Sequence, residues 1–283
     1  MVPAMGHVGV WSHEMRFGER DLVDEAAIEL EALGYGALWI PGGIDDGVLD
    51  DVDRLLSRTS RLAIGTGIIN IWKQSAADVA YWWKAQSPER QARVWLGVGV
   101  SHAPLIGKDW GRPIARMRSW LDDASASGMP GDALCLAALG PQMLAMARDR
   151  TGGAHPYLVT PEHTAAARAL LGPGKQLAPE LGVVLECDPN KARSEARKAL
   201  QRYTLLPNYV NNWKWLGFAD DEISAMSDRL VDALFAWGQP DQIAARVQAH
   251  RDAGADHVCL QVITSHGLDG ARAAWRSLAD LLL

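Results

Sequence analysis

The chain has 283 residues, of which 48% are hydrophobic and 22% charged, a balance typical of a folded globular protein rather than a disordered one. Its 28 Lys and Arg against 34 Asp and Glu give a formal net charge of −6. Such a surface offers no electrostatic reason to bind nucleic acid or an anionic membrane, since both partners need a basic patch. At this length one large domain can account for residues 1–283, and we expect a single domain.

The three cysteines do not form a recognisable site. Cys135, Cys187 and Cys259 are far apart and include no CxxC pair, so neither a zinc ribbon nor a disulfide framework is indicated, and no metal site is predicted. The N-terminus lacks the basic and apolar regions of a signal peptide. The most apolar stretch, residues 62–72, is far too short for a membrane span. We therefore expect a protein of the reducing cytoplasm.

Short apolar runs recur along the chain, each bounded by Gly, Pro or Asp. Continuous apolar runs of this length suit strands that are buried on both faces of a parallel sheet. The predicted strands are 8–11, 37–40, 62–69, 94–100, 134–139, 155–159, 180–186 and 257–263.

Helical patterns separate these runs. They cover 21–33, 76–86, 112–127, 141–149, a stretch after Thr160, 189–203 and 240–253. Strand–helix alternation repeated about eight times predicts a (β/α)8 TIM barrel. A doubly wound open sheet is the alternative, but the first predicted turn, residues 11–21, has no glycine cluster to bind a phosphate. Segment 204–237 breaks the alternation and is predicted to be an insertion that forms a lid, a substrate wall or a subunit contact.

In a TIM barrel the loops after the strands share one face, where active sites form. The residues at those positions are Ser12-His13, Pro41-Gly42-Gly43, Asn70-Ile71-Trp72, Ser101-His102 and Gly140-Pro141, while His155, Pro156 and Tyr157 lie in the sixth predicted strand. Three histidines thus converge on one predicted rim, either as functional groups or as ordinary polar rim residues. Gly140-Pro141 opens a helix whose free N–H groups suit a phosphate, and Thr160 offers a second such start. Ordinary helix capping is the alternative for both.

Several segments together resemble a known family. They are ALGYGALWIPGG, RLAIGTGIINIW, VWLGVGVSHAPLIG, CLAALGPQMLAMARDRTGGAHPYLVTPEHT and GQPDQIAARVQAHRDAGADHV, in this order. The chain resembles the luciferase-like monooxygenase superfamily, and within it the branch that uses the deazaflavin coenzyme F420. The resemblance implies a (β/α)8 barrel with the deazaflavin at the C-terminal rim, usually in a homodimer, acting on a small-molecule substrate.

The resemblance also implies individual cofactor contacts. In similar proteins the third strand ends in a non-prolyl cis peptide against the ring, and the matching bond here is Asn70-Ile71. Ala138, Leu139, Gly140 and Pro141 would meet the phosphate or ribityl chain, with Thr160 nearby. Ser101 would hydrogen-bond the cofactor and His155 would orient its tail.

The expected function is hydride transfer between F420 and an organic substrate, because a deazaflavin is a two-electron carrier. The alternatives are an FMN-dependent monooxygenase and a cofactor-free barrel that acts as a binding protein. Among groups that titrate near neutrality, His102 is the preferred proton donor and His13 the second choice. The other interpretation of His102 is a hydrogen bond to a ring carbonyl. Tyr209, Trp213 and Trp215 favour a large apolar or ring-bearing substrate, although core packing explains them equally well.

Overall fold

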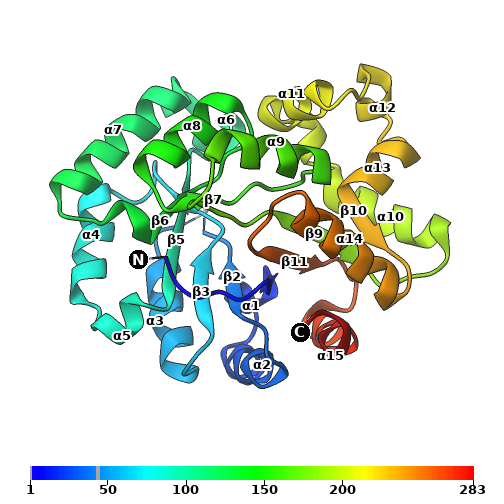
Figure 1. The fold of residues 1–283 in the computed structure, drawn as a ribbon, viewed down its shortest axis with the longest axis horizontal. Coiled ribbons are helices and arrows are strands. Elements are labelled where there is room, and N and C mark those ends of the chain that lie inside the picture. Colours follow the sequence, from blue (N-terminus) through cyan, green and yellow to red (C-terminus); the bar gives the residue numbers. More distant parts are fainter. Residues whose placement is uncertain (1, 43–44) are drawn as a thin grey trace.

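The computed structural model describes residues 2–42 and 45–283, so Gly43 of the second predicted rim segment lies outside the described residues. A parallel sheet stands at its centre and helices surround it (Figure 1). The strands are β1 (Val8–Trp11), β2 (Ala37–Ile40), β3 (Ala63–Thr66), β4 (Ile69–Asn70), β5 (Val94–Gly99), β6 (Leu134–Leu136), β7 (Gly153–Ala154), β8 (Gln176–Leu177), β9 (Glu180–Val184), β10 (Phe235–Trp237) and β11 (Val258–Val262).

The sheet closes on itself through β8 and β9, which are two parts of one extended segment interrupted at Ala178-Pro179. β8 pairs with β7, whereas β9 pairs with β11, and both pairings are parallel. From β11 the path runs through β1, β2, β3, β5 and β6 back to β7. The predicted α/β TIM-barrel fold is therefore confirmed, with β10 added beside β9.

Most predicted strands occur where the apolar runs placed them, with three differences. The predicted strand 62–69 is divided into β3 and β4. The predicted strand 155–159 is wrong, because β7 is Gly153–Ala154 and the chain leaves the sheet soon after it. Pro156 has no N–H for a ladder, and Leu158 has a left-handed φ of 53°. Segment 204–237 contains three helices and also β10, which was not predicted.

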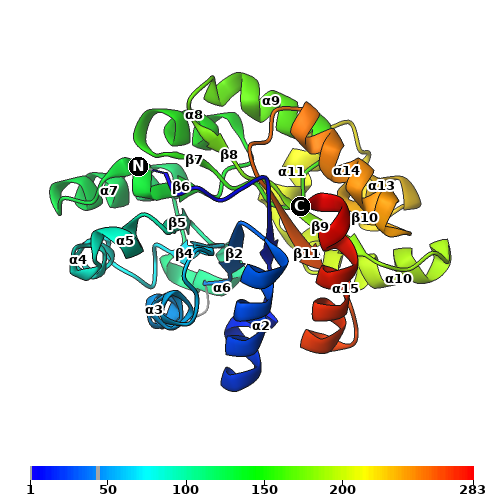
Figure 2. The ribbon, with the colours of Figure 1, turned by 60° about the horizontal axis from the view of Figure 1, so that its bottom comes forward.

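The helices lie outside the sheet, and those after β6 and β7 lie side by side (Figure 2). None of those in the described residues is both long and apolar enough to cross a membrane. The helices are α1 (Glu14–Phe17), α2 (Arg20–Leu33), α3 (Val48–Arg58), α4 (Ala76–Ala85), α5 (Pro88–Gln91), α6 (Ala103–Ile106), α7 (Pro113–Ala126), α8 (Pro141–Arg150), α9 (Pro161–Leu171), α10 (Pro189–Leu200), α11 (Pro207–Trp215), α12 (Asp220–Ser224), α13 (Asp228–Leu234), α14 (Pro240–Asp252) and α15 (Gly267–Leu282).

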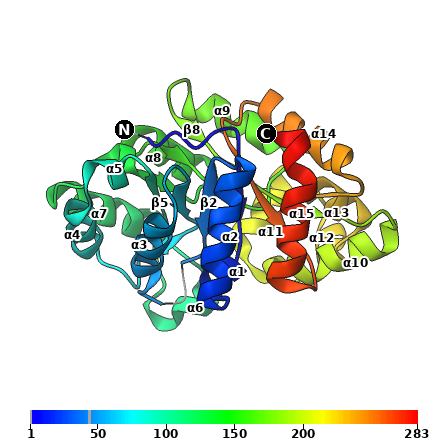
Figure 3. The ribbon, with the colours of Figure 1, turned by 90° about the horizontal axis from the view of Figure 1, so that it is seen from below.

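The last helix closes the ring of helices against one near the start of the chain. α15 lies beside α2 (Figure 3), so the last helix packs against the second one. Arg272 and Arg276 of α15 both pair with Glu29 of α2. Trp275 lies on the buried face of α15. Its backbone carbonyl accepts a hydrogen bond from the Tyr35 hydroxyl at 2.9 Å.

Indole rings fill the interior of the barrel. Trp39 of β2 and Trp95 of β5 meet edge to face, with ring centroids 5.8 Å apart. The imidazole of His155 stacks on Trp39 at 4.4 Å, and Trp39 Nε1 donates to His257 Nε2 at 3.2 Å. Gly65 of β3 faces the same indole, and a Cβ there would lie 2.5 Å from Trp39 ring carbons. A glycine is therefore required at position 65 by packing.

Adding one methyl group at this position tests the packing. We expect Gly65→Ala to lower the free energy of unfolding by about 1–3 kcal/mol, because the indole must shift within a filled core. Urea unfolding followed by circular dichroism measures the change. Gly111→Ala is the matched control, since nothing lies within 4 Å of a Cβ at that position. Equal stability of the two variants would show that the interior is loosely packed.

Candidate active site at the C-terminal face of the barrel

A cavity of about 760 Å³ opens at the C-terminal ends of β5 and β6, beneath α8, α9 and α11. Its volume lies in the range typical of small-molecule and cofactor sites. It is lined by Val100, Ser101, His102, Ala103, Trp110, Pro113, Ile114, Ala137, Leu139, Gly140, Pro141, Gln142, Met143, Leu144, His163, Ala166, Ala167, Leu170, Leu206, Pro207, Asn208, Asn211, Asn212 and Trp215.

The start of α8 opens into this cavity without a cap. Gly140 occupies the N-cap position, offers no side chain to the first N–H groups, and is followed by a first turn that contains no acidic residue. The start of α9 differs, because the Thr160 hydroxyl accepts the His163 N–H and Glu162 lies in its first turn. The positive end of the α8 dipole is thus left uncompensated, as an anion-binding helix start requires.

His102 follows β5 and faces the wall formed by α11. Its ring lies 5.7 Å from the ring of Tyr209, and its side chain hydrogen-bonds that of Asn208. Burial lowers the pKa of His102 below 6.5, the Asn208 hydrogen bond opposes this shift, and the positive charge of Arg202 adds to it. His102 is therefore a neutral imidazole at pH 7. The preceding Ser101 has a left-handed φ of 59°, which turns the chain into the cavity.

His163 and Asn212 also line the cavity, and neither was predicted from the sequence. His163 Nε2 donates to the carbonyl of Leu139 at 2.9 Å, which leaves Nδ1 as the acceptor of a neutral ring. Burial lowers the pKa of His163 as well. Within the described residues, His163 Nδ1 and the amide nitrogen of Asn212 have no hydrogen-bond partner. A signal for His163 lies in its position, because it follows Thr160 by three residues at a helix start that the sequence offers as a phosphate site.

The structure brings together five of the residues predicted as site residues. Ser101, His102, Leu139, Gly140 and Pro141 all line the cavity. The position of each is set by the C-terminal end of β5 or by the start of α8. Of the predicted substrate contacts, Trp215 lines the cavity, whereas Tyr209 and Trp213 are buried beside it.

The other predicted residues lie elsewhere. Asn70, Ile71 and Ala138 are buried and do not line the cavity, and Thr160 caps α9. His155 lies inside the barrel on Trp39, with Nδ1 donating to the carbonyl of Ala178 at 2.7 Å. His13 is exposed at the start of α1, where its ring packs on Phe17 at 4.6 Å.

The expected position of the cis peptide was wrong. The cis bond joins Gly67 and Ile68, and the bond Asn70-Ile71 is not cis. The cis bond Gly67-Ile68 falls between β3 and β4, where the chain interrupts its pairing with the neighbouring strand. Ile68 occupies the space that a Cβ on Gly99 would fill, beside Ala137 of the cavity lining.

Next to the cavity, tyrosines cover the mouth of the barrel. Tyr157 donates to Gln261 Oε1 at 2.6 Å and receives the Tyr203 hydroxyl at 3.3 Å. Trp213 Nε1 donates to the carbonyl of Leu158 at 3.2 Å, which ties α11 to the turn after β7. Part of segment 204–237 is therefore a cavity wall that is anchored to the barrel.

Glu180 lies beneath these tyrosines and is 1% exposed. One carboxyl oxygen accepts the Leu158 N–H at 3.1 Å, and the other has no partner in the part of the chain that the structure describes. Burial raises the pKa of Glu180 to about 8, so this carboxyl is protonated at pH 7.

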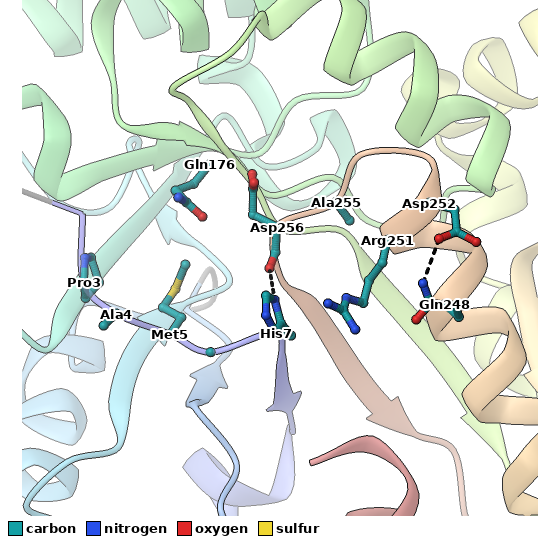
Figure 4. Close-up of a pocket in the computed structure, with 11 residues that line it drawn as sticks. Pro3, Ala4, Met5, His7, Gln176, Gln248, Arg251, Asp252, Ala255 and Asp256 are labelled. Atoms are coloured by element: carbon teal, nitrogen blue, oxygen red, sulfur yellow. Dashed lines mark hydrogen bonds between the residues drawn. The ribbon is translucent and has the colours of Figure 1, made fainter.

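Two further cavities do not contain the predicted site residues. One of about 550 Å³ lies at the opposite, N-terminal end of the strands, where His7, Gln176 and Arg251 surround it (Figure 4). An active site is not expected at that face, because the active sites of TIM barrels form at the other end of the strands. The second, about 720 Å³, lies at the ends of β9 and β11 between α10 and α15, and charged side chains such as Lys191 and Glu195 line it.

The buried carboxyl of Glu180 gives a pH-dependent prediction. Between its ordinary pKa near 4.5 and its folded value of about 8, the folded state holds a proton that the unfolded state has lost. Unfolding then releases a proton, so the free energy of unfolding should fall as pH rises, by up to about 1.4 kcal/mol per pH unit. Chemical denaturation between pH 6.5 and 8 measures the slope. Burial also lowers the pKa values of His155 and His257 to about 4 and that of His250 to about 3, so these three groups raise the free energy of unfolding with pH until about one pH unit above 6.5, and the Glu180 effect is read as the difference between wild-type protein and a Glu180 variant.

Glu180→Gln keeps an acceptor for the Leu158 N–H and should remove most of this slope. Glu25→Gln, an exposed carboxyl on α2, is the control and should keep it. Equal slopes in the wild-type protein and in Glu180→Gln would show that Glu180 is ionised in the folded protein.

Comparison with known proteins shows which solved structures share this fold. No protein-family model and no curated protein sequence matches the chain. Among solved structures, it is similar to an F420-dependent secondary alcohol dehydrogenase in complex with an F420–acetone adduct, with 12% identity, a TM-score of 0.73, and 98% of this chain and 99% of that chain covered. It is also similar to the coenzyme F420-dependent tetrahydromethanopterin reductase from Methanopyrus kandleri, with 14% identity, a TM-score of 0.69 and 99% of each chain covered.

A third similar structure binds a different cofactor. It is the oxygenating constituent of 3,6-diketocamphane monooxygenase from Pseudomonas putida in complex with FMN, with 13% identity, a TM-score of 0.66, and 97% of this chain and 96% of that chain covered. At these identities the likeness concerns the fold. The chain has the TIM-barrel-like fold of F420-dependent oxidoreductases and luciferase-like monooxygenases, as the resemblance of its sequence motifs predicted.

Proposed function

We propose that this protein is an F420-dependent oxidoreductase that transfers a hydride between the deazaflavin and an organic substrate. The observation that carries the proposal is the cavity at the C-terminal face, which the uncapped start of α8 and the neutral His102 share. The likeness of the fold to two F420-dependent enzymes supports it.

The residues of the cavity fit such a cofactor. Apolar side chains, among them Leu139, Met143 and Leu206, suit a flat ring, and the start of α8 would hold the phosphate through the N–H groups of Gln142 and Met143. No Lys or Arg of the described residues lines the cavity, so the anionic tail of F420 would extend beyond it. Gly140 leaves room for this, because nothing lies within 4 Å of a Cβ there.

When bound, the deazaflavin supplies two-electron hydride chemistry. His102 supplies the proton chemistry in this proposal. A neutral imidazole accepts a proton, so His102 suits the oxidation of an alcohol, where the hydroxyl proton must leave as the carbonyl forms. In the reverse reaction the same nitrogen returns the proton. Asn208 holds the ring in place from α11.

An FMN-dependent monooxygenase is the second candidate, favoured by the similar structure that contains FMN and by the fact that the start of α8 suits either phosphate. Thermal unfolding with each cofactor separates the two. A ligand at 100 times its dissociation constant adds about 2.7 kcal/mol of stability. We expect F420 to protect the protein. Protection by FMN alone would favour the monooxygenase, and protection by neither would favour a non-catalytic binding barrel.

A negative charge at the start of α8 should weaken binding of the cofactor. Gln142→Glu adds a carboxylate at the second helical position, which favours the helix itself but repels a phosphate there. We expect the dissociation constant for F420, measured by fluorescence titration, to rise about tenfold or more. Asn190→Asp adds the same charge at the same position of α10, outside the cavity, and should leave the affinity unchanged. Equal affinities for F420 in all three proteins would place the phosphate elsewhere.

Removal of the proton acceptor should affect turnover and not cofactor affinity. We expect His102→Ala to lower kcat by about 10²–10⁴-fold, the usual effect of losing a positioned acid–base group. In the oxidation direction, activity should rise with pH through a pKa below 6.5, since burial lowers that of His102.

Arg202→Gln removes a positive charge near His102, so the pKa of His102 should rise. The rise of activity with pH should then occur at higher pH. Arg251→Gln, at the opposite face of the barrel, is the matched control and should not move it. Normal kcat of His102→Ala at saturating cofactor, with weakened binding, would make His102 a binding residue.

A further inference from the structure

The cavity at the C-terminal face is electrically neutral. Among the described residues that line it there is no Asp, Glu, Lys or Arg. Its two histidines are His102 and His163, and burial lowers the pKa of both, so neither carries a charge at pH 7. A charged group that entered such a cavity away from the start of α8 would lose its hydration and find no counter-charge.

The polar groups that do line the cavity are amides and neutral rings. Asn208, Asn211 and Asn212 lie on α11, and Gln142 lies at the start of α8. Carboxamides and imidazoles donate and accept hydrogen bonds without requiring a charge on the ligand. They therefore suit a carbonyl or a hydroxyl group.

One exposed apolar side chain lines the cavity, and two others lie close to its lining residues in sequence. Trp215 of α11 lines the cavity and is nevertheless 63% exposed. Leu105 of α6 is 60% exposed, and Leu205, in the 3-10 helix before α11, is 80% exposed. Both leucines are close in sequence to lining residues. The Trp215 indole therefore offers an exposed apolar surface to a ligand that enters the cavity.

We propose that the substrate of this cavity is an uncharged, mostly apolar molecule with one carbonyl or hydroxyl group, and that carboxylates and phosphate esters are excluded from the substrate position. The term substrate rests on the proposed function, but the preference for neutral ligands does not. Trp215 supplies apolar contact, and the His102–Asn208 pair receives the oxygen. The cofactor phosphate at α8 is the one anionic group that the site accommodates.

A matched pair of ligands tests this preference without any cofactor, in a buffer with saturating inorganic phosphate, so that phosphate and not the carboxylate occupies the start of α8. 2-Acetylnaphthalene and 2-naphthoate share one ring system, but at pH 8 the first is neutral and the second is an anion. Isothermal titration calorimetry measures their binding to the wild-type protein. We expect the ketone to bind at least about 100-fold more tightly, because the carboxylate would be desolvated without a partner.

Three variants connect the preference to this cavity. Trp215→Ala should weaken binding of the ketone about tenfold through lost apolar contact. Tyr81→Ala removes an aromatic ring of α4 that is 79% exposed and does not line the cavity, and should have no effect. Asn211→Lys places a cation on an exposed lining position and should improve binding of 2-naphthoate at least about tenfold.

The outcomes separate this inference from the proposed function. Equal or tighter binding of 2-naphthoate to the wild-type protein overturns the inference, as does failure of both ligands to bind. Indifference of both affinities to Trp215→Ala and Asn211→Lys also overturns it. If the ketone binds as expected but neither F420 nor FMN protects the protein, the neutral-ligand cavity stands and the proposed enzyme activity fails. If F420 protects the protein but the carboxylate is preferred, the activity stands and the inference fails.

Discussion

The accommodation of Trp39 inside the barrel is the constraint on which the rest of the architecture depends. The indole stacks on His155 and donates a hydrogen bond to His257. It also packs closely against Gly65, where a Cβ would not fit. These contacts join β2, β3, β7 and the residue before β11, which together span most of the ring of strands. A filled interior holds the C-terminal ends of the strands in fixed positions. The loops that carry Ser101, His102 and Gly140 can then form one cavity reproducibly.

Much of this fold could be predicted because buried parallel strands leave a strong local signal. The runs that became β1, β2, β5, β9 and β11 are continuous and apolar. β7 has only Gly153 and Ala154, whose small side chains give no such signal, and the more apolar residues that follow belong to a turn. β10 is defined by its pairing with β9, a contact between residues far apart in sequence. The cis bond at Gly67-Ile68 lies three residues before its expected position, since a motif match does not fix the register of a backbone bulge.

The candidate site was partly predictable for a similar reason. Some site residues directly follow a strand, such as His102, or begin a helix, such as Gly140. Their place at the site follows from the fact that the loops after the strands of a TIM barrel share one face. His163, Asn208 and Asn212 reach the cavity only because α9 and α11 pack across it, and that packing is a tertiary contact. His155 illustrates the opposite error. It was assigned to the rim because its predicted strand began two residues late, and its side chain instead belongs to the interior.

The filled interior has a consequence for the order of events in the cavity. Trp39, Trp95 and Cys135 occupy the space between the two ends of the strands, so in the described residues the barrel provides no channel from the cavity beside α8 to the one around His7. A cofactor and a substrate bound as proposed would then both enter and leave across the same rim, past Trp215. If one of them lies deeper in the cavity, it would be covered by the one that follows. Steady-state kinetics should accordingly be ordered, with the deeper ligand released last in every cycle.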